Sequence, residues 1–308
     1  SDCVIPKTEM QLQNDRSSAS KEEDKTGAAE TEKNLFFKEI YGDFPYAYNT
    51  IGQKNTVNKI TRKDVLKFYK NNINIGNASI VIISSLSKKE VIDIAEKISK
   101  SLNSNVKESF KEMVLAGINK EKHIYKKFSS EQAHIYIGGL SVERGSKNHL
   151  PLYVGNYIFG GSGFSARLMQ ELRVKRGLTY GVYSYIHPMK NTGPFVIGIE
   201  TKSEQAQESV ELIHKMLREF YKNGPTDKEL KHAKQSIING FPLMIDSNSD
   251  ILNYLSLINY YNLPLDYLNT FTSRISNITK KDIMRSFEDD IDVNKLITLV
   301  VGNEKAKK

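Results

Sequence analysis

Residues Gly160–Ile186 read GGSGFSARLMQELRVKRGLTYGVYSYI, which predicts a glycine turn, a helix, a second glycine turn and a strand. Ser165 has the side chain of a helix N-cap, and basic residues followed by Gly177 are typical of a helix end. We therefore predict a helix from about Ala166 to Arg176. One apolar residue recurs at every fourth position of this stretch: Phe164, Leu168 and Leu172.

After Leu178 the period of the pattern changes from four to two, which predicts a half-buried strand. Because side chains alternate across a strand, its two faces should carry two different sets of residues. One face is expected to hold Tyr180, Val182, Ser184 and Ile186, and the other Gly181, Tyr183, Tyr185 and His187.

Arg173, near the end of the predicted helix, and Tyr180, early in the strand, form the candidate functional pair. The intervening turn can place both side chains at the opening of the same cavity. A guanidinium with five donors and a phenol with one suit a carbonyl oxygen that becomes negative during acyl transfer. The alternative is that Arg173 forms a surface ion pair and Tyr180 packs in a core.

The same stretch resembles a segment of the pitrilysin/insulinase family of zinc peptidases, the inverzincins. The family pattern is a Gly-Gly turn, an Arg-Leu pair, a Glu-Leu-Arg, a Gly-Leu and a Tyr. The residues that match this pattern are Gly160, Gly161, Arg167, Leu168, Glu171, Leu172, Arg173, Gly177, Leu178 and Tyr180. A second family pattern, Gly-x-x-Pro-Tyr with a later Gly, is matched by Gly42, Pro45, Tyr46 and Gly52. The resemblance covers nearly everything from Leu35 onward.

The resemblance implies that Arg173 and Tyr180 are catalytic and that the chain closes over a peptide or unfolded polypeptide. None of the six histidines begins the zinc motif of the family, His-x-x-Glu-His. The six are His123, His134, His149, His187, His214 and His232. We therefore expect no metal or other cofactor in this chain, which should be inactive alone. Zinc is expected in a missing N-terminal part or in a zinc-bearing subunit. With such a subunit this chain would form a homo- or heterodimer. The alternative is a non-catalytic structural or peptide-binding homologue.

A repeat divides the chain into two copies of one domain. The stretch from Ile60, ITRKDVLKFY, is echoed 218 positions later by the stretch from Ile278, ITKKDIMRSF. Residues 1–34 form a polar lead-in whose composition favours disorder. Residues 35–105 are predicted to be the C-terminal part of a first peptidase-like domain, and residues 106–308 a complete second one. If the copies are equal in length, roughly 110 residues are absent from the front of the first.

Strands alternate with long helices, which predicts an α+β fold in which each mixed sheet is covered by helices. The predicted strands include Ser79–Ser84, Gln132–Gly138 and Phe195–Ile199, and the predicted helices include Lys88–Leu102, Leu150–Phe159 and Asp250–Tyr260. Helix starts are indicated by Thr61, by Thr201 with Glu204 and by Thr226 with Glu229. The resemblance implies two such homologous domains in a clamshell arrangement, the first of them truncated.

Composition excludes several classes of protein. With 39% hydrophobic and 26% charged residues, the 308-residue chain is globular. The net charge of +8 is spread along helices without a basic run interleaved with aromatic residues, so nucleic acid is not an expected partner. No apolar run approaches the ~20 residues of a membrane helix. Cys3 is the one cysteine, so no internal disulfide forms. The family resemblance favours the bacterial periplasm or another non-membrane compartment.

The sequence offers little support for three other kinds of site. Gly161-x-Gly163-x-x-Ala166 fits a dinucleotide fingerprint, but the residues before it indicate a helix, and no acidic residue stands about twenty positions later. A tight turn where a helix meets a sheet is the better interpretation. A nucleophilic serine or cysteine is not indicated, since there is no G-x-S-x-G elbow. The glutamates Glu131, Glu143 and Glu171 show no pairing that suggests acid–base catalysis.

Overall fold

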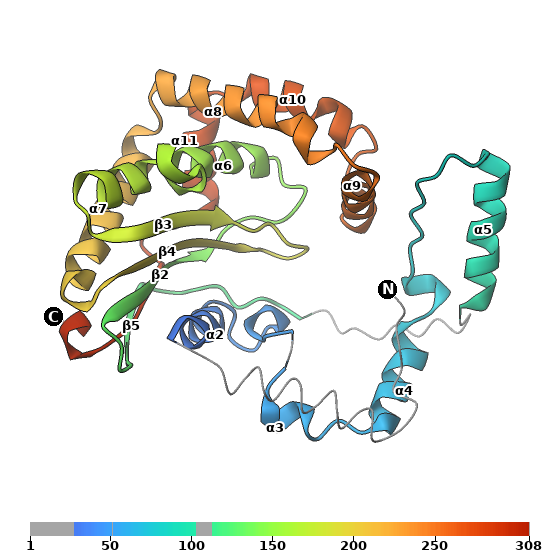
Figure 1. The fold of residues 1–308 in the computed structure, drawn as a ribbon, viewed down its shortest axis with the longest axis horizontal. Coiled ribbons are helices and arrows are strands. Elements are labelled where there is room, and N and C mark those ends of the chain that lie inside the picture. The colour runs from blue at the N-terminus through green and yellow to red at the C-terminus, as the bar shows by residue number, and fades with distance from the viewer. Residues whose placement is uncertain (1–27, 51, 103–112, 308) are drawn as a thin grey trace. The chain divides into compact units, whose positions relative to one another are not determined.

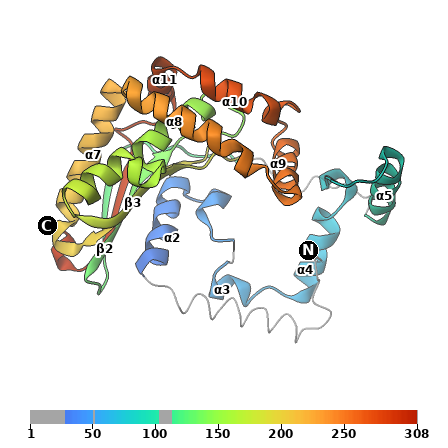
Figure 2. The same ribbon diagram turned by 45° about the horizontal axis from the view of Figure 1, so that its top comes forward.

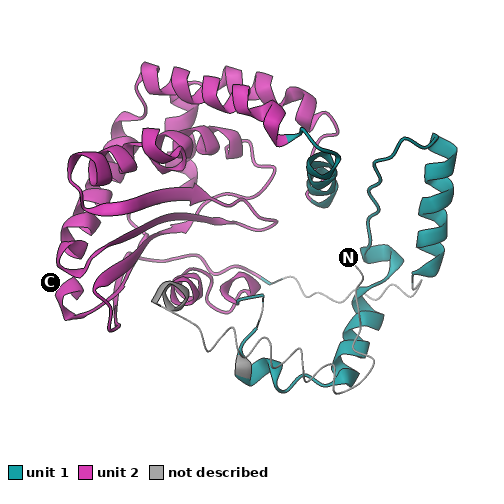
Figure 3. Cartoon of the chain, viewed as in Figure 1, with its two compact units in different colours: residues 1–26, 49–113, 245–260 teal, residues 27–48, 114–244, 261–308 magenta. Residues whose placement is uncertain are grey.

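The computed structural model describes residues 28–50, 52–102 and 113–307. These residues belong to two compact units, which are coloured separately in Figure 3. The larger unit comprises 27–48, 114–244 and 261–308, and the smaller comprises 1–26, 49–113 and 245–260. The units therefore do not follow the order of the chain. Most of the predicted polar lead-in, residues 1–27, lies outside the described residues.

The larger unit is built on a five-stranded mixed sheet (Figure 1). Its strands, in spatial order, are β1 (Lys122–Lys127), β5 (Ile297–Gly302), β2 (Gln132–Leu140), β4 (Pro194–Lys202) and β3 (Thr179–Ile186). The β1–β5 contact is parallel and the other three are antiparallel. This sheet confirms the predicted α+β class and places β3 at one edge.

Helices cover one face of the sheet (Figures 1 and 2). They are α6 (His149–Asn156), α7 (Ala206–Asn223), α8 (Asp227–Gly240), α10 (Tyr267–Asn277) and α11 (Lys280–Asp290). Helix α7 packs on β2 and β4, and α11 packs on α6 and α7. A row of phenylalanines forms the core of this layer, because the Phe220 ring lies 5.4 Å from Phe159 and 5.1 Å from Phe287, centre to centre.

The opposite face of the sheet is partly covered by α2 (Ala28–Tyr41) and the short 3₁₀ turn η1 (Pro45–Ala47). Figure 2 shows α2 on the side of the sheet away from α7 and α8. Its buried residues Phe36 and Ile40 lie one helical turn apart and pack in a cluster with Leu299 of β5. Helix α2 thus covers the β5 and β2 side of this face.

The smaller unit contains α3 (Lys54–Val57), α4 (Arg62–Asn72), the 3₁₀ turn η2 (Ile75–Asn77), α5 (Lys88–Ser101) and α9 (Asn248–Tyr260). Helices α5 and α9 confirm two of the predicted helices. The strand predicted at Ser79–Ser84 is absent, since these described residues form no ladder with another segment. A strand is stable only when neighbouring strands accept its backbone hydrogen bonds, and an apolar alternation alone does not supply them.

The predicted helix starts have different outcomes. Thr61 with Asp64 and Thr226 with Glu229 form reciprocal capping boxes. Thr201 does not cap a helix, because it is the eighth residue of β4 and its hydroxyl donates to the Leu178 carbonyl at 2.6 Å. Its expected partner Glu204 is ion-paired with Lys305 instead. The short 3₁₀ turns that complete the larger unit are η4 (Gly163–Ser165), η6 (Ser203–Gln205), η7 (Phe241–Met244) and η8 (Glu304–Lys307).

The two repeat stretches form helices of the same length with the same cap. Helix α11 begins with a capping box at Thr279, as α4 does at Thr61. Helix α11 buries Phe287 in the core, whereas Tyr69, at the equivalent position of α4, is 36% exposed. The two stretches therefore share a local structure and differ in what covers them. Their assignment to two copies of one domain stays a prediction.

No helix among the described residues is long and apolar enough to cross a membrane.

Candidate functional site

Arg173 lies on a π-helical segment, η5 (Met169–Lys175), which replaces most of the α-helix predicted between 166 and 176. Leu172 of this segment is fully buried, whereas the adjacent Arg173 is partly exposed. The Arg173 guanidinium carbon lies 4.6 Å from the centre of the Phe164 ring. This is a cation–π contact, and it fixes the direction in which the cation points.

The predicted N-cap of this helix is wrong. The Ser165 hydroxyl lies 2.8 Å from Ser162 Oγ, on the side away from the helix, and Ala166 has the extended backbone of the residue that precedes a helix. Ser165 instead belongs to the 3₁₀ turn η4, which holds Phe164 with its ring 61% exposed. The turn therefore presents the ring on which Arg173 rests.

Tyr180 occupies a β-bulge in β3. Thr179 pairs with Thr201 of β4, but Gly181 pairs with the adjacent Glu200, so Tyr180 is an extra residue in the ladder. Its side chain is 84% exposed, whereas Val182 is buried under the helical layer. The prediction that Tyr180 shares a face with Val182 is therefore wrong. Simple alternation fails because the bulge turns one side chain outward.

A tight turn connects the two candidate residues. The Gly177 N–H donates to the Arg173 carbonyl at 3.1 Å, and the Leu178 N–H donates to the Leu172 carbonyl at 2.8 Å. Gly177 has a φ of +65°, a backbone conformation that favours glycine. The turn thus joins the end of the Arg173 helix directly to the start of the Tyr180 strand. In the described structure the guanidinium and the phenol are not hydrogen-bonded to each other.

Gly160 lies in a second π-helical segment, η3 (Tyr157–Gly161), where it has a packing role. A Cβ on Gly160 would overlap the side-chain oxygen and the backbone nitrogen of Ser184 in β3. In the same place, the Asn156 amide donates to the Ser184 carbonyl at 3.0 Å and accepts from its hydroxyl at 2.6 Å. Gly160 therefore ends a helical segment that packs on β3, and the turn after it, η4, joins two helical segments and not the predicted helix and sheet.

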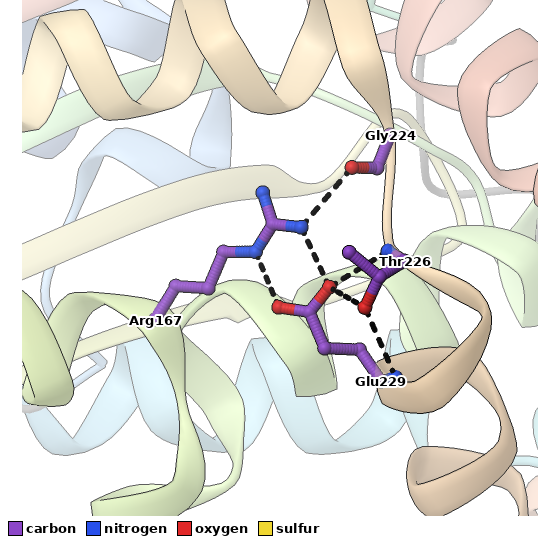
Figure 4. A network of polar contacts seen from close by, with 4 residues as sticks. All are labelled: Arg167, Gly224, Thr226 and Glu229. Atoms are coloured by element: carbon purple, nitrogen blue, oxygen red, sulfur yellow. Dashed lines mark hydrogen bonds and ion pairs between the residues drawn. The ribbon is translucent and has the colours of Figure 1, made fainter.

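Arg167, which precedes the π-helix, anchors this region to α8 (Figure 4). Its guanidinium makes two hydrogen bonds of 2.6 Å to the Glu229 carboxylate and one of 3.1 Å to the Gly224 carbonyl. The same carboxylate accepts from the backbone and hydroxyl of Thr226 at 2.7 Å. Burial acts to raise the pKa of Glu229, but the Arg167 and Thr226 hydrogen bonds outweigh it and lower the pKa to about 2. Arg167 is therefore a structural residue.

Aromatic side chains line the part of the sheet next to the candidate pair. The Tyr183 ring lies across Gly198 of β4, where any side chain would displace it, and stacks on Tyr185 at 6.2 Å. Its hydroxyl is 3.5 Å from that of Tyr136 in β2. Burial raises the pKa of Tyr185 to about 12, so this phenol stays neutral at ordinary pH.

The described residues contain no group of three or more His, Cys, Asp or Glu side chains that could hold a metal ion. Some histidines have structural partners instead, such as His214, which lies 2.9 Å from Thr298 Oγ1. His149 is partly buried, and this burial together with Arg144 and Arg274 lowers its pKa to about 3. Glu171 forms ion pairs with Lys175 and Arg176, which lower its pKa.

Sequence comparison identifies the class of protein. Residues 59–237, more than half of the chain, match the family profile described as the peptidase M16 inactive domain. The chain therefore belongs to the peptidase M16 family, as the resemblance indicated.

Among curated relatives, the Non-peptidase homolog YmxG of Helicobacter pylori (strain ATCC 700392 / 26695) is 28% identical, over 88% of this chain and 62% of that protein. The Uncharacterized zinc protease YmxG of Bacillus subtilis (strain 168) is 28% identical, over 70% and 51%. The chain thus spans only part of the length of these relatives.

Solved structures show the same fold. A peptidase M16 inactive domain from Pseudomonas fluorescens superimposes with a TM-score of 0.90 and 30% identity, covering 96% of this chain and 71% of that one. A protease from Helicobacter pylori superimposes with a TM-score of 0.85 at 18% identity, over 96% and 72%. The second match, at this identity, concerns the fold alone.

Proposed function

We propose that this chain supplies Arg173 and Tyr180 to a zinc peptidase of the M16 family, as part of a longer protein or as its non-zinc subunit. The two side chains would donate hydrogen bonds to the scissile carbonyl oxygen of a bound peptide while that oxygen becomes negative. The proposal is carried by one observation: a single tight turn joins a bulge that exposes Tyr180 to a helix end whose arginine rests on an aromatic ring.

The charge environment of Arg173 supports this role. Its neighbours Lys175 and Arg176 both form ion pairs with Glu171, at 2.8 and 3.0 Å. Within the described part of the chain, no carboxylate lies within ion-pair distance of Arg173. A guanidinium held by an aromatic ring alone keeps its donors available for an incoming anion or carbonyl oxygen.

Zinc would come from residues outside this chain. A curated relative of greater length is named a zinc protease, and this chain covers 51% of it. We propose that the remaining part of such a protein, or a partner subunit, holds the metal, which would polarise the carbonyl and activate water. A peptide enclosed between the two parts would be the substrate.

The exposed apolar residues of the smaller unit support the proposed domain division. Phe68 on α4 is 59% exposed and Ile92 on α5 is 46% exposed, although both helices have well-formed caps. Ser79–Ser84 stands at the repeat position of β5, which is paired on both sides in the larger unit. We propose that 35–105 is the end of a first domain whose sheet would cover α4 and α5, while its residues 35–48 pack on the larger unit.

A non-catalytic homologue is the second candidate function. It is favoured by the name of one relative, a non-peptidase homolog. A protein that only binds peptides or holds a complex together has no need of a guanidinium free of ion pairs and an exposed phenol on the two elements that one turn joins. That argument favours the first candidate.

A cleavage assay separates the two candidates. The chain would be mixed with the zinc-bearing part, taken from the longer gene product or from a partner subunit, and incubated with fluorogenic peptides. We expect cleavage by the mixture and none by either component alone. Peptide binding by the mixture, measured by fluorescence anisotropy, without cleavage of any peptide would favour the non-catalytic homologue.

A further inference from the structure

The bulge at Tyr180 removes backbone hydrogen bonds from the ladder between β3 and β4, and a buried hydroxyl replaces them. Thr179 is 8% exposed, and its Oγ1 lies 3.0 Å from the Gly181 nitrogen. The same oxygen lies 2.8 Å from the Gly181 carbonyl and 2.5 Å from the Glu200 carbonyl. One hydroxyl thus contacts three backbone groups at the bulge.

The chemistry of a hydroxyl limits what these contacts can be. It carries one proton, so it donates to one carbonyl at a time, while its lone pairs accept from the Gly181 N–H. On the other side of the bulge, the Thr201 hydroxyl donates to the Leu178 carbonyl at 2.6 Å. Thr179 and Thr201 are directly opposite each other in the ladder. Their hydroxyls therefore fix the backbone immediately before and after Tyr180.

We propose that Thr179 is a positioning residue, which acts on the reaction by holding Tyr180 out of the regular alternation of β3. Without its hydroxyl, the Gly181 N–H would lose the side-chain oxygen that accepts its hydrogen bond. The strand would then regain a regular ladder, and Tyr180 would turn toward the face of Val182 or become mobile. The consequence for catalysis rests on the proposed function of Tyr180, whereas the effect on the bulge does not.

The substitutions Thr179→Val and Thr179→Ser separate the hydroxyl from the shape of the side chain. Valine keeps the branched shape and removes the hydroxyl, whereas serine keeps the hydroxyl. Thr298→Val is the matched control, because Thr298 is also a buried threonine of this sheet with a side-chain partner, His214. A buried threonine with a purely structural role should behave as Thr298 does.

The first measurement is amide hydrogen exchange of Gly181 in the chain itself. We expect Thr179→Val to accelerate exchange by about tenfold or more, since the Gly181 N–H loses its acceptor, and Thr179→Ser to leave it near the wild-type rate. Thr298→Val should not change it selectively. Unchanged exchange in Thr179→Val would overturn the proposal whether or not the chain serves a peptidase.

The second measurement is a double-mutant cycle on turnover by the assembled peptidase, which is this chain together with the proposed zinc-bearing part. Thr179→Val should lower kcat more than it changes KM, and adding Tyr180→Phe should cause no further loss. Thr179→Ser should restore turnover, and Thr298→Val should combine additively with Tyr180→Phe. Additive losses for Thr179→Val and Tyr180→Phe would contradict the positioning role. If Tyr180→Phe alone has no effect, the proposed function fails, and the exchange measurement still decides the role of Thr179.

Discussion

The Arg173 guanidinium rests on the Phe164 ring, with 4.6 Å between the guanidinium carbon and the ring centre. The two residues come from different elements, the π-helix η5 and the 3₁₀ turn η4. An aromatic ring orients the cation and leaves its charge available, whereas a carboxylate would neutralise it. The turn η4 thus contributes to the candidate site through Phe164.

Phe164→Leu should weaken this orientation. An exposed cation–π contact contributes about 0.5–1 kcal/mol, so kcat/KM of the assembled peptidase should fall about two- to fivefold. Phe164→Tyr is the matched control, because it keeps the ring, and it should retain wild-type kcat/KM. Equal kcat/KM for Phe164→Leu and the wild type would show that the ring does not serve Arg173.

Glu229→Gln should destabilise the larger unit. The substitution weakens the charge-assisted hydrogen bonds from Arg167 and the cap of α8 together, and the expected loss is about 1–3 kcal/mol. Glu204→Gln is the control, because its ion pair with Lys305 is exposed and screened by solvent, so its loss should change stability little. Urea denaturation followed by circular dichroism measures both. A smaller loss for Glu229→Gln than for Glu204→Gln would contradict the anchoring role of Arg167.

The same carboxylate predicts a pH dependence of stability. Its pKa is about 2 in the folded protein and 4.5 without these contacts, so the folded state binds this proton less readily. The stabilisation is therefore present above pH 4.5 and is lost as the pH falls from 4.5 toward 2. The difference in unfolding free energy between the wild type and Glu229→Gln should shrink over that window. A difference that stays constant from pH 6 to pH 2.5 would contradict the assignment.

Gly160→Ala should be more harmful than an ordinary glycine substitution. The added methyl group would overlap the backbone nitrogen of Ser184 in β3, and overpacking of this kind is destabilising by about 1–3 kcal/mol. Gly240→Ala is the control, because Gly240 ends α8 with open space around its Cα. It should leave the midpoint of thermal unfolding unchanged or raise it. Similar midpoints for the two variants would argue against close packing at Gly160.

Much of the larger unit could be predicted from periodicity and end signals. Leu168 and Leu172 of the predicted stripe do lie in a buried helical segment, and Thr226 with Glu229 does start a helix. Phe164, the third member of the stripe, lies in the turn η4 and is exposed, so that part of the prediction is wrong. Thr201 has the same spacing to Glu204 but lies in a strand. Spacing alone cannot decide between the two, because the outcome depends on which strand is available as a partner.

Arg173 and Tyr180 stay the predicted site residues, and the geometry around them could not be predicted. Arg173 and Tyr180 could be chosen from the family pattern, whereas the bulge that exposes Tyr180 breaks the alternation used to predict β3. The contacts of Phe164 and Thr179 were missed. An aromatic residue next to glycines in a turn, as at Phe164, was the sequence signal that could have indicated an exposed ring. The hydroxyl of Thr179 gave none, because its partners are backbone groups.

Turnover by the Tyr180→Phe variant of the assembled peptidase tests the central claim most directly. Loss of one hydrogen-bond donor to a developing oxyanion typically lowers kcat about 10²- to 10³-fold. We predict a fall of that order with little change in peptide binding, since the aromatic ring is kept. Wild-type turnover in this variant would contradict the claim that the chain stabilises the scissile carbonyl oxygen.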